Sequence, residues 1–476
     1  MTGARPHPPV FSERLLVAFA AALLLLSAAA QWLVPPPAEE TGTPALLLER
    51  NPELEWQGRY LLGLDQLLRL AGQDRAQLQA SLETIISSTP GPVDRLRLAA
   101  LAVALEEPDQ AAELVNSVRG ELDETTISPF DALLAHPGVE SVDKETVGTA
   151  EEALGAESVQ TEPEDTATPS PEELEAAHGF YGELVVAATA GDLQAPRQAS
   201  LRFALLVFAG AVAGVLALLI GSILSTVAYL RWRDGRLQSA YRREVAAPID
   251  QDPALRTAYL ETFILAILAM QVLGVIVALA MPADEGTPRW PLLLNWLLLP
   301  VMLWPLTRGL DRRAVLAGLG WTRGRGLIVE MCCGFIGYIA AAPLLVLGFL
   351  ASALVARSLD RPPHHPILDW VQGAGALDLA LIVSIAALWA PIVEESLFRG
   401  AFFHYLRARW GPLSSAFTVS VAFAALHPQG LAGLPFLISL AVALAMIREW
   451  RGSLIAPITV HLIHNSLVMG LLLSLL

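Results

Sequence analysis

The sequence predicts an all-α membrane protein, a polytopic bundle of about eight or nine transmembrane helices with an extracytoplasmic helical domain after the first span. Of its 476 residues 54% are hydrophobic, and the mean hydropathy is +0.50, values that are hard to reconcile with one soluble domain. Acidic residues are concentrated in one segment, because residues 35–200 hold 31 of the 47 acidic and only 9 of the 31 basic residues. The apolar segments typical of a membrane protein are therefore separated along the chain from the acidic segment typical of a soluble domain.

The candidate spans are runs of ~17–25 apolar residues, long enough to cross ~30 Å of hydrocarbon. They lie at Leu15–Val34, Phe203–Leu230, Tyr259–Met281, Trp290–Leu306, Leu327–Ala356, Ala376–Phe398, Leu413–His427, Leu431–Ile447 and Ser453–Leu476. The predicted parts of the chain are an N-terminal transmembrane helix or signal anchor (1–34), an extracytoplasmic helical domain (35–137), an acidic low-complexity linker (138–200), transmembrane helices (201–356) and a C-terminal core (376–472) that carries the polar motifs described below.

Arginine clusters in alternate loops predict the orientation. They lie at Arg231 to Arg256, Arg308 to Arg325, Arg399 to Arg409, and Arg448 with Arg451. By the positive-inside rule these loops are cytoplasmic, which places the N-terminus inside and residues 35–200 outside. The first span also resembles a secretory signal peptide, and that alternative exports the same segment. The Arg-rich loops and the single lysine, Lys144, suggest a bacterial cytoplasmic (inner) membrane.

The outer segment shows helical periodicity, for example in "LLLERNPELEWQGRYLLGLDQLLRLAG", and predicts a small helical bundle that could bind a protein partner. Its acidic balance predicts no nucleic-acid partner. Both cysteines, Cys332 and Cys333, lie inside a predicted span, so no disulfide framework is expected in this domain.

Three polar motifs interrupt the C-terminal spans: "EESLFR", "FAALH" and "HLIHN". An ionised side chain near the centre of a bilayer costs at least about 2.5–3.5 kcal/mol, so such groups must be paired, neutralised or face a wet cavity. The motifs supply the candidate site residues Glu394, Glu395, Arg399, His427, His461 and Asn465. We interpret His404 and His464, which lie close by, as bystanders.

Helical spacing predicts how these side chains are arranged. Glu395 and Arg399 are four residues apart and can pair on one face, whereas Glu394 points ~100° away without a local counter-charge. His461 and Asn465 share a face of the last helix for the same reason.

Glu394 and His427 are each ~24 Å from the turn at residues 410–411, so in an antiparallel hairpin they can face each other. Pro391, one turn before the glutamates, is expected to kink its helix and open the chamber.

The chemistry that these residues could perform is hydrolysis. A desolvated carboxylate that shares a water with a histidine can act as a general base, and a second histidine with an amide can donate hydrogen bonds to an oxyanion. The alternative is a Zn²⁺ site formed by Glu394, His427 and His461, although the sequence contains no HExxH motif that would require one.

The three motifs resemble the EExxxR, FxxxH and HxxxN motifs of the CPBP family, the CAAX proteases and bacteriocin-processing enzymes, also called the Abi family of intramembrane endopeptidases. The resemblance covers roughly residues 376–472. It implies that Glu394 with His427 activates water, that His461 and Asn465 form the oxyanion hole, and that Glu395 and Arg399 support the site.

The resemblance also implies an endopeptidase that cleaves a membrane-associated protein or peptide within or at the edge of the lipid bilayer. We expect it to require no cofactor, because the pairing of His461 with the Asn465 amide suits an oxyanion better than a zinc shell; zinc is the alternative. Eukaryotic members trim prenylated CAAX proteins, but nothing in this sequence shows a prenylated substrate. Some relatives serve as scaffolds or immunity proteins, so a non-enzymatic membrane scaffold is the alternative function. A proton-coupled transporter is a third class, but the sequence lacks the repeated halves with broken helices that this class predicts.

Overall fold

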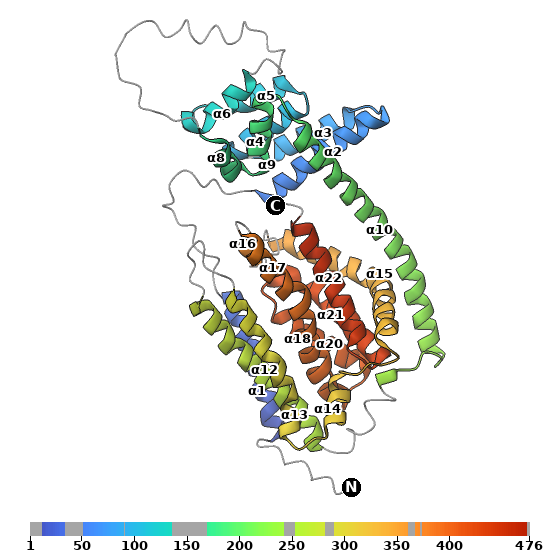
Figure 1. Cartoon of the computed structure of the whole chain (residues 1–476). Helices are drawn as coiled ribbons and strands as arrows, with labels where there is room; N and C mark the ends of the chain where they lie inside the picture. The colour runs from blue at the N-terminus through green and yellow to red at the C-terminus, as the bar shows by residue number, and fades with distance from the viewer. Residues whose placement is uncertain are drawn as a thin grey trace, which may run out of the picture. The chain divides into compact units, whose positions relative to one another are not determined.

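The computed structural model describes residues 12–33, 51–89, 91–135, 169–241, 253–280, 290–359, 367–371 and 374–473. These residues are nearly all helical and contain no β-strand, which confirms the all-α prediction. The chain divides into two compact units, one formed by residues 37–213 and the other by residues 1–36 and 214–474 (Figure 1). We refer to them as the outer unit, after its predicted location, and the membrane unit.

The outer unit is a helical bundle built around a buried central helix. Its helices are α2 (Pro52–Ala71), α3 (Ala76–Ser88), α4 (Pro92–Ala104), α5 (Pro108–Ser117), α6 (Glu124–Leu134), α8 (Pro171–His178), α9 (Phe180–Thr189) and the first part of α10 (Gln194–Arg233). Several of them begin with proline, which is favoured at the first helical position because its missing N–H would have no partner there. Every residue of α4 from 96 to 104 is buried, so this helix forms the centre of the bundle.

The structure differs from the predicted linker at residues 138–200. Residues 138–168 lie outside the described residues, but α8 and α9 are helical and part of the outer core. Ser170 forms a capping box with Glu173, and the hydroxyl of Tyr181 donates to the carbonyl oxygen of Leu54 at 2.6 Å. The predicted linker therefore reaches too far toward the C-terminus. Although the sequence before it is acidic, the apolar run at 180–188 buries enough surface to order this segment.

The predicted spans lie in the membrane unit, apart from the first part of α10. Six helices of the described residues are long and apolar enough to cross a membrane: Gln194–Arg233, Arg256–Val277, Leu327–Leu359, Ala376–Arg407, Gly430–Arg451 and Ile455–Leu473. The three other predicted segments are also helical, as α1 (Glu13–Leu33), η1 (Trp290–Leu303) with α13 (Trp304–Thr307), and α20 (Pro412–Ala425). The chain is therefore an integral membrane protein, and the span count agrees roughly with the prediction.

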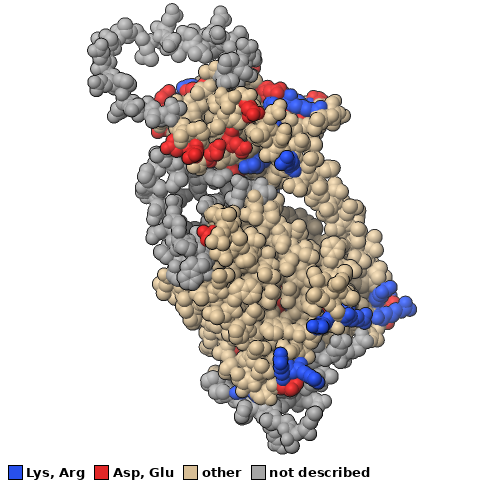
Figure 2. Space-filling view, viewed as in Figure 1, with Lys and Arg blue, Asp and Glu red and all other residues tan. Residues whose placement is uncertain are grey.

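Four of these six helices belong to α12 (Pro253–Ala280), α15 (Leu327–Leu359), α21 (Gly430–Arg451) and α22 (Ile455–Leu473), and the unit also contains the shorter helices α14 (Arg312–Leu319) and α16 (Ile367–Val371). The visible face of this unit is almost free of charged side chains except toward one end, where arginines gather (Figure 2). An uncharged belt of this kind is the surface that a bilayer requires, because ionised groups are costly in hydrocarbon.

Helix α1 packs as an integral part of the membrane unit. Leu16 and Ala20 are buried in its main core, and Gln271 on α12 donates to the hydroxyl of Ser27 at 2.9 Å. Glu13 forms an ion pair with Arg409. These contacts join α1 to the core of the membrane unit.

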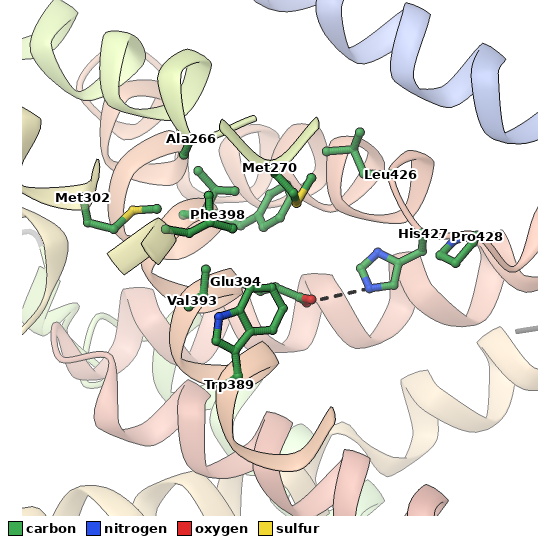
Figure 3. Close-up of a pocket in the computed structure, with 12 residues that line it drawn as sticks. Ala266, Met270, Met302, Trp389, Val393, Glu394, Phe398, Leu426, His427 and Pro428 are labelled. Carbon is green, nitrogen blue, oxygen red and sulfur yellow. Dashed lines mark ion pairs between the residues drawn. The ribbon is translucent and has the colours of Figure 1, made fainter. Parts of the chain in front are cut away.

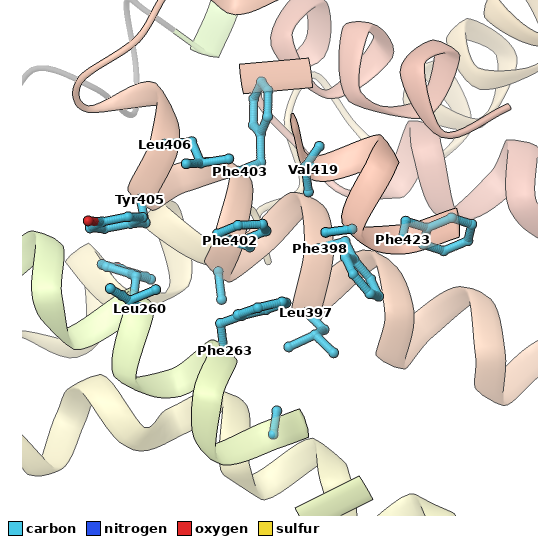
Figure 4. Packing of buried hydrophobic residues seen from close by; sticks show 14 of the residues in the cluster. Leu260, Phe263, Leu397, Phe398, Phe402, Phe403, Tyr405, Leu406, Val419 and Phe423 are labelled. Atoms are coloured by element: carbon cyan, nitrogen blue, oxygen red, sulfur yellow. The ribbon is translucent and has the colours of Figure 1, made fainter. Parts of the chain in front are cut away.

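A stack of aromatic rings positions the segment that carries the glutamates. Phe263 of α12 stacks on Phe402 with ring centroids 4.2 Å apart, and Phe398 meets Phe423 of α20 edge-on at 5.1 Å (Figure 4). Gly400 permits a close backbone approach, since a Cβ there would lie 2.9 Å from the carbonyl oxygen of Leu319. The segment is thus fixed from α12, α14 and α20.

The predicted orientation can be checked with reporter fusions. A reporter placed after Arg409 should report a cytoplasmic location and one placed at Pro169 an external location, because the arginine clusters alternate in that sense. The predicted loop position at Arg243 lies outside the described residues. A cytoplasmic signal from the fusion at Pro169 would overturn the orientation.

Candidate active site

The candidate site is formed where the 376–407 span meets α20 and α22. This span is built from α17 (Ala376–Ser384), the π-helical η2 (Ile385–Trp389), α18 (Ala390–Glu395), the π-helical η3 (Ser396–Phe402) and α19 (Phe403–Arg407). Glu394 lies with its Oε2 atom 3.7 Å from His427 Nε2 and 3.9 Å from His461 Nε2. Figure 3 shows Glu394 and His427 pointing toward each other. The structure therefore brings together three of the four predicted catalytic residues.

Hydrogen bonds fix the rings of both histidines. His427 Nδ1 lies 2.8 Å from the carbonyl oxygen of Phe423, and His461 Nδ1 lies 2.9 Å from Glu395 Oε1. Because each acceptor is an oxygen without a proton to give, Nδ1–H is the donor in both cases. The Nε2 atom of each ring is consequently left facing Glu394.

Glu395 and Arg399 form the buried pair that the helical spacing predicts. Arg399 Nη1 lies 2.8 Å from Glu395 Oε1, and both side chains are fully buried. Arg399 also donates to the carbonyl oxygen of Ala441 at 3.0 Å, and its guanidinium lies 4.7 Å above the centre of the Phe423 ring. Glu395 therefore links Arg399 to His461, which connects the ion pair to the ring facing Glu394.

Glu394 Oε2 is a buried acceptor with no hydrogen-bond partner among the described residues. Its 3.7 Å separation from His427 Nε2 is too long for a hydrogen bond. A water lying off the line between the two atoms could be about 2.8 Å from each and bond to both. The pair can thus hold the water that a hydrolase must activate.

The same three residues can be tested as zinc ligands. Their atom types fit, because two imidazole nitrogens and a carboxylate oxygen, with Nδ1 bonded to further acceptors, are typical of zinc sites. Their spacing does not fit, since ligand atoms at ~2.0–2.1 Å from a tetrahedral zinc are about 3.4 Å apart. Within the described part of the chain, no three His, Cys, Asp or Glu side chains converge as metal ligands.

Asn465 bonds to the π-helical turn before the glutamates. In a π-helix the N–H of residue i bonds to the carbonyl of residue i−5, as Ala390 does with Ile385. The next residue, Pro391, has no N–H, so the carbonyl oxygen of Ala386 lacks its helical donor. Asn465 Nδ2 donates to that oxygen at 2.8 Å. Pro391 thus lies beside a widened turn, and Asn465 satisfies the carbonyl that it leaves open.

A double-variant cycle separates this contact from the predicted oxyanion role of Asn465. We expect Asn465→Ala to lower the thermal stability, and Pro391→Ala to restore part of it in the double variant by supplying the missing N–H. Turnover that stays about a hundred-fold low in the double variant would support oxyanion donation, the usual scale for losing one such donor. A double variant no more stable than Asn465→Ala alone would contradict the contact with Ala386. Ser466→Ala, at an exposed position of α22, is the control.

The two histidines interpreted as bystanders lie in other contacts. His404 Nδ1 bonds to the hydroxyl of Tyr241, and His464 Nδ1 lies 3.0 Å from the hydroxyl of Tyr338. Trp389 is not among the residues predicted from the sequence, but its indole lies beside Glu394 and lines the adjoining pocket (Figure 3). Because Trp389 is an apolar residue in an apolar span, its residue type does not mark it as part of a site. The one available signal is its position five residues before Glu394.

Comparison with known proteins identifies one domain. Residues 376–467 match the family described as type II CAAX prenyl endopeptidase Rce1-like. This match agrees with the resemblance to the CPBP family and covers all six candidate site residues. No curated protein and no solved structure significantly matches the chain.

Proposed function

We propose that this chain, which carries an Rce1-like CAAX endopeptidase domain at residues 376–467, is an intramembrane endopeptidase that hydrolyses a peptide bond of a membrane-associated protein or peptide. The observation that carries the proposal is the unpartnered carboxylate oxygen of Glu394, buried and facing the Nε2 atoms of two histidines. A buried, unpaired carboxylate beside imidazoles is typical of general-base chemistry.

In the proposed mechanism, Glu394 and His427 hold the attacking water. Glu394 takes a proton from the water as its oxygen attacks the carbonyl carbon of the substrate, and the proton then passes to the leaving amine. The hydrogen bond from His427 Nδ1 to Phe423 keeps the Nε2 atom directed at the water. Glu394 comes from the 376–407 span and His427 from the segment just after α20, and the mostly apolar surroundings of the pair strengthen electrostatic interactions.

His461 is proposed to donate a hydrogen bond to the carbonyl oxygen as it becomes negative. Because Nδ1–H is bonded to Glu395, Nε2 can donate only when the ring carries both protons. The hydrogen bond to the buried Glu395 carboxylate fixes the orientation of that ring. Asn465 remains the predicted second donor.

Comparison of membrane proteomes tests the proposal directly. Cells carrying the wild-type protein should contain cleaved fragments of at least one membrane protein, and cells carrying Glu394→Gln should accumulate it uncut. Terminal peptides that depend on Glu394 would identify both the substrate and the bond. Identical fragment patterns in the two strains would reject proteolysis, and a bacterial host with its own copy deleted removes the background.

A zinc-dependent version of the same protease is the second candidate, favoured by the orientation of both Nε2 atoms toward Glu394. We expect purified protein to contain clearly less than one metal ion per chain and to keep its activity during prolonged chelation. Elemental analysis and activity before and after added Zn²⁺ measure this. Stoichiometric zinc, with activity that disappears on chelation and returns with the metal, would decide for the metalloprotease.

A further inference from the structure

A pocket adjoins the Glu394–His427 pair inside the membrane unit. Residues of α12, η1, the 376–407 span and the turn just after α20 line it, and its volume is about 160 Å³. Met302 and His427 are drawn at opposite ends of the lining, with Trp389 and Val393 between them (Figure 3). The pocket therefore extends from the proposed catalytic pair into the apolar interior of the unit.

The size of the pocket limits what it can hold. A cavity of about 150 Å³ lined by Leu, Ile and Phe accommodates one benzene molecule. The pocket beside Glu394 is of the same order, which is enough for one leucine, methionine or phenylalanine side chain. A farnesyl chain has about fifteen carbon atoms against six in benzene, so most of it would have to lie outside.

The lining is apolar apart from three groups. Glu394 and His427 form the catalytic pair, and the third is the indole N–H of Trp389. Trp389 is only 8% exposed, and its Nε1 atom has no hydrogen-bond partner among the described residues. A buried donor without a partner costs about 1–3 kcal/mol, so this N–H favours a bound oxygen acceptor.

We propose that this pocket is the specificity site of the enzyme and binds one unmodified apolar side chain, of the size of leucine, methionine or phenylalanine, next to the bond that is cut. Trp389 Nε1–H donates to a carbonyl oxygen of the bound peptide, and Met302 sets the depth of the pocket. The inference rests on the proposed function, since it names the substrate feature that the same site recognises.

The test uses the purified full chain in lipid nanodiscs with a library of synthetic peptides, read out by mass spectrometry. The wild-type protein should cut with one position restricted to leucine, methionine or phenylalanine. Met302→Ala deepens the pocket and should shift the preference toward tryptophan by about ten-fold, the scale of one or two methylene groups in an apolar pocket. Leu297→Ala, at a position 62% exposed on the same helix, is the matched control and should leave the preference unchanged.

The donor role of Trp389 is tested by Trp389→Phe, which removes the N–H and keeps most of the ring. We expect KM to rise about ten-fold on the library peptides, with the size preference retained, because the apolar walls remain. An unchanged KM would overturn this hydrogen bond.

A comparison of a farnesylated peptide with its unmodified form tests the size limit of the pocket. Cleavage of the farnesylated peptide alone would overturn the single-side-chain pocket and leave the protease assignment intact. A preference that Met302→Ala does not move would overturn it as well.

A binding experiment separates failure of the pocket from failure of catalysis. Glu394→Gln protein is irradiated with library peptides that carry photo-leucine, whose side chain is close to leucine in size. Cross-links to Met302, Met270 or Trp389 support the pocket even if no peptide is cut, in which case only the proposed function fails. Cross-links confined to lipid-facing helices such as α10 would overturn the pocket, whether or not cleavage occurs.

Discussion

Replacing Glu394 by glutamine is expected to lower the turnover of a cleaved peptide by about a thousand-fold or more, without loss of folded protein. The substitution keeps the shape of the side chain and removes the carboxylate that takes the proton from water. Its Oε2 atom has no hydrogen-bond partner among the described residues, so few stabilising contacts are lost. Turnover by the purified variant, measured beside its thermal unfolding curve, checks both parts of the expectation.

Two control variants make this result specific. Glu113→Gln changes an exposed glutamate of the outer unit in the same way and should leave turnover unchanged. His427→Gln should lower turnover by a smaller factor, roughly a hundred-fold, because Glu394 can still accept the proton. Wild-type turnover by Glu394→Gln would reject Glu394 as the base, whatever the behaviour of the controls.

Most of the site geometry that could be predicted from the sequence follows from the spacing of residues along a helix. The i,i+4 relation is enough to pair Glu395 with Arg399, and equal distances from the turn at 410–411 are enough to place Glu394 opposite His427. Both relations follow from helical spacing, which a membrane span favours by requiring internal hydrogen bonds. They hold although Ser396–Phe402 is π-helical and His427 lies two residues beyond the end of α20.

The remaining features depend on departures from that geometry. The i,i+4 spacing predicted that Asn465 shares a helix face with His461. In the structure the widened turn before Pro391 exposes the carbonyl oxygen of Ala386, and the side-chain amide of Asn465 donates to that oxygen. The pocket could not be predicted either, because its walls come from four separate segments whose side chains all look alike in an apolar sequence. The helices at 171–189 were not predicted because the average composition of residues 138–200 is acidic, although this segment contains a boundary between acidic and apolar sequence.

Replacing Arg399 by alanine is expected to cause the largest loss of stability among single substitutions at the site. The change leaves the fully buried Glu395 carboxylate without its guanidinium and removes the donor to the carbonyl oxygen of Ala441. Removing one partner of a buried ion pair costs about 3–5 kcal/mol, because an uncompensated charge remains in a medium of low dielectric constant. The yield of folded, monodisperse protein and its thermal unfolding temperature measure the effect.

A second substitution shows whether the unpaired charge is the cause. Glu395→Gln added to Arg399→Ala removes that charge while keeping an oxygen that can accept from His461 Nδ1, so the double variant should be more stable than Arg399→Ala alone. Arg313→Ala, at an exposed position of α14, should leave the unfolding temperature unchanged. Equal stability of Arg399→Ala and the wild type would show that the pair is not structural. Equal instability of the single and double variants would assign the loss to the packing of Arg399 on Phe423 and its bond to Ala441, since those are the contacts that both variants lack.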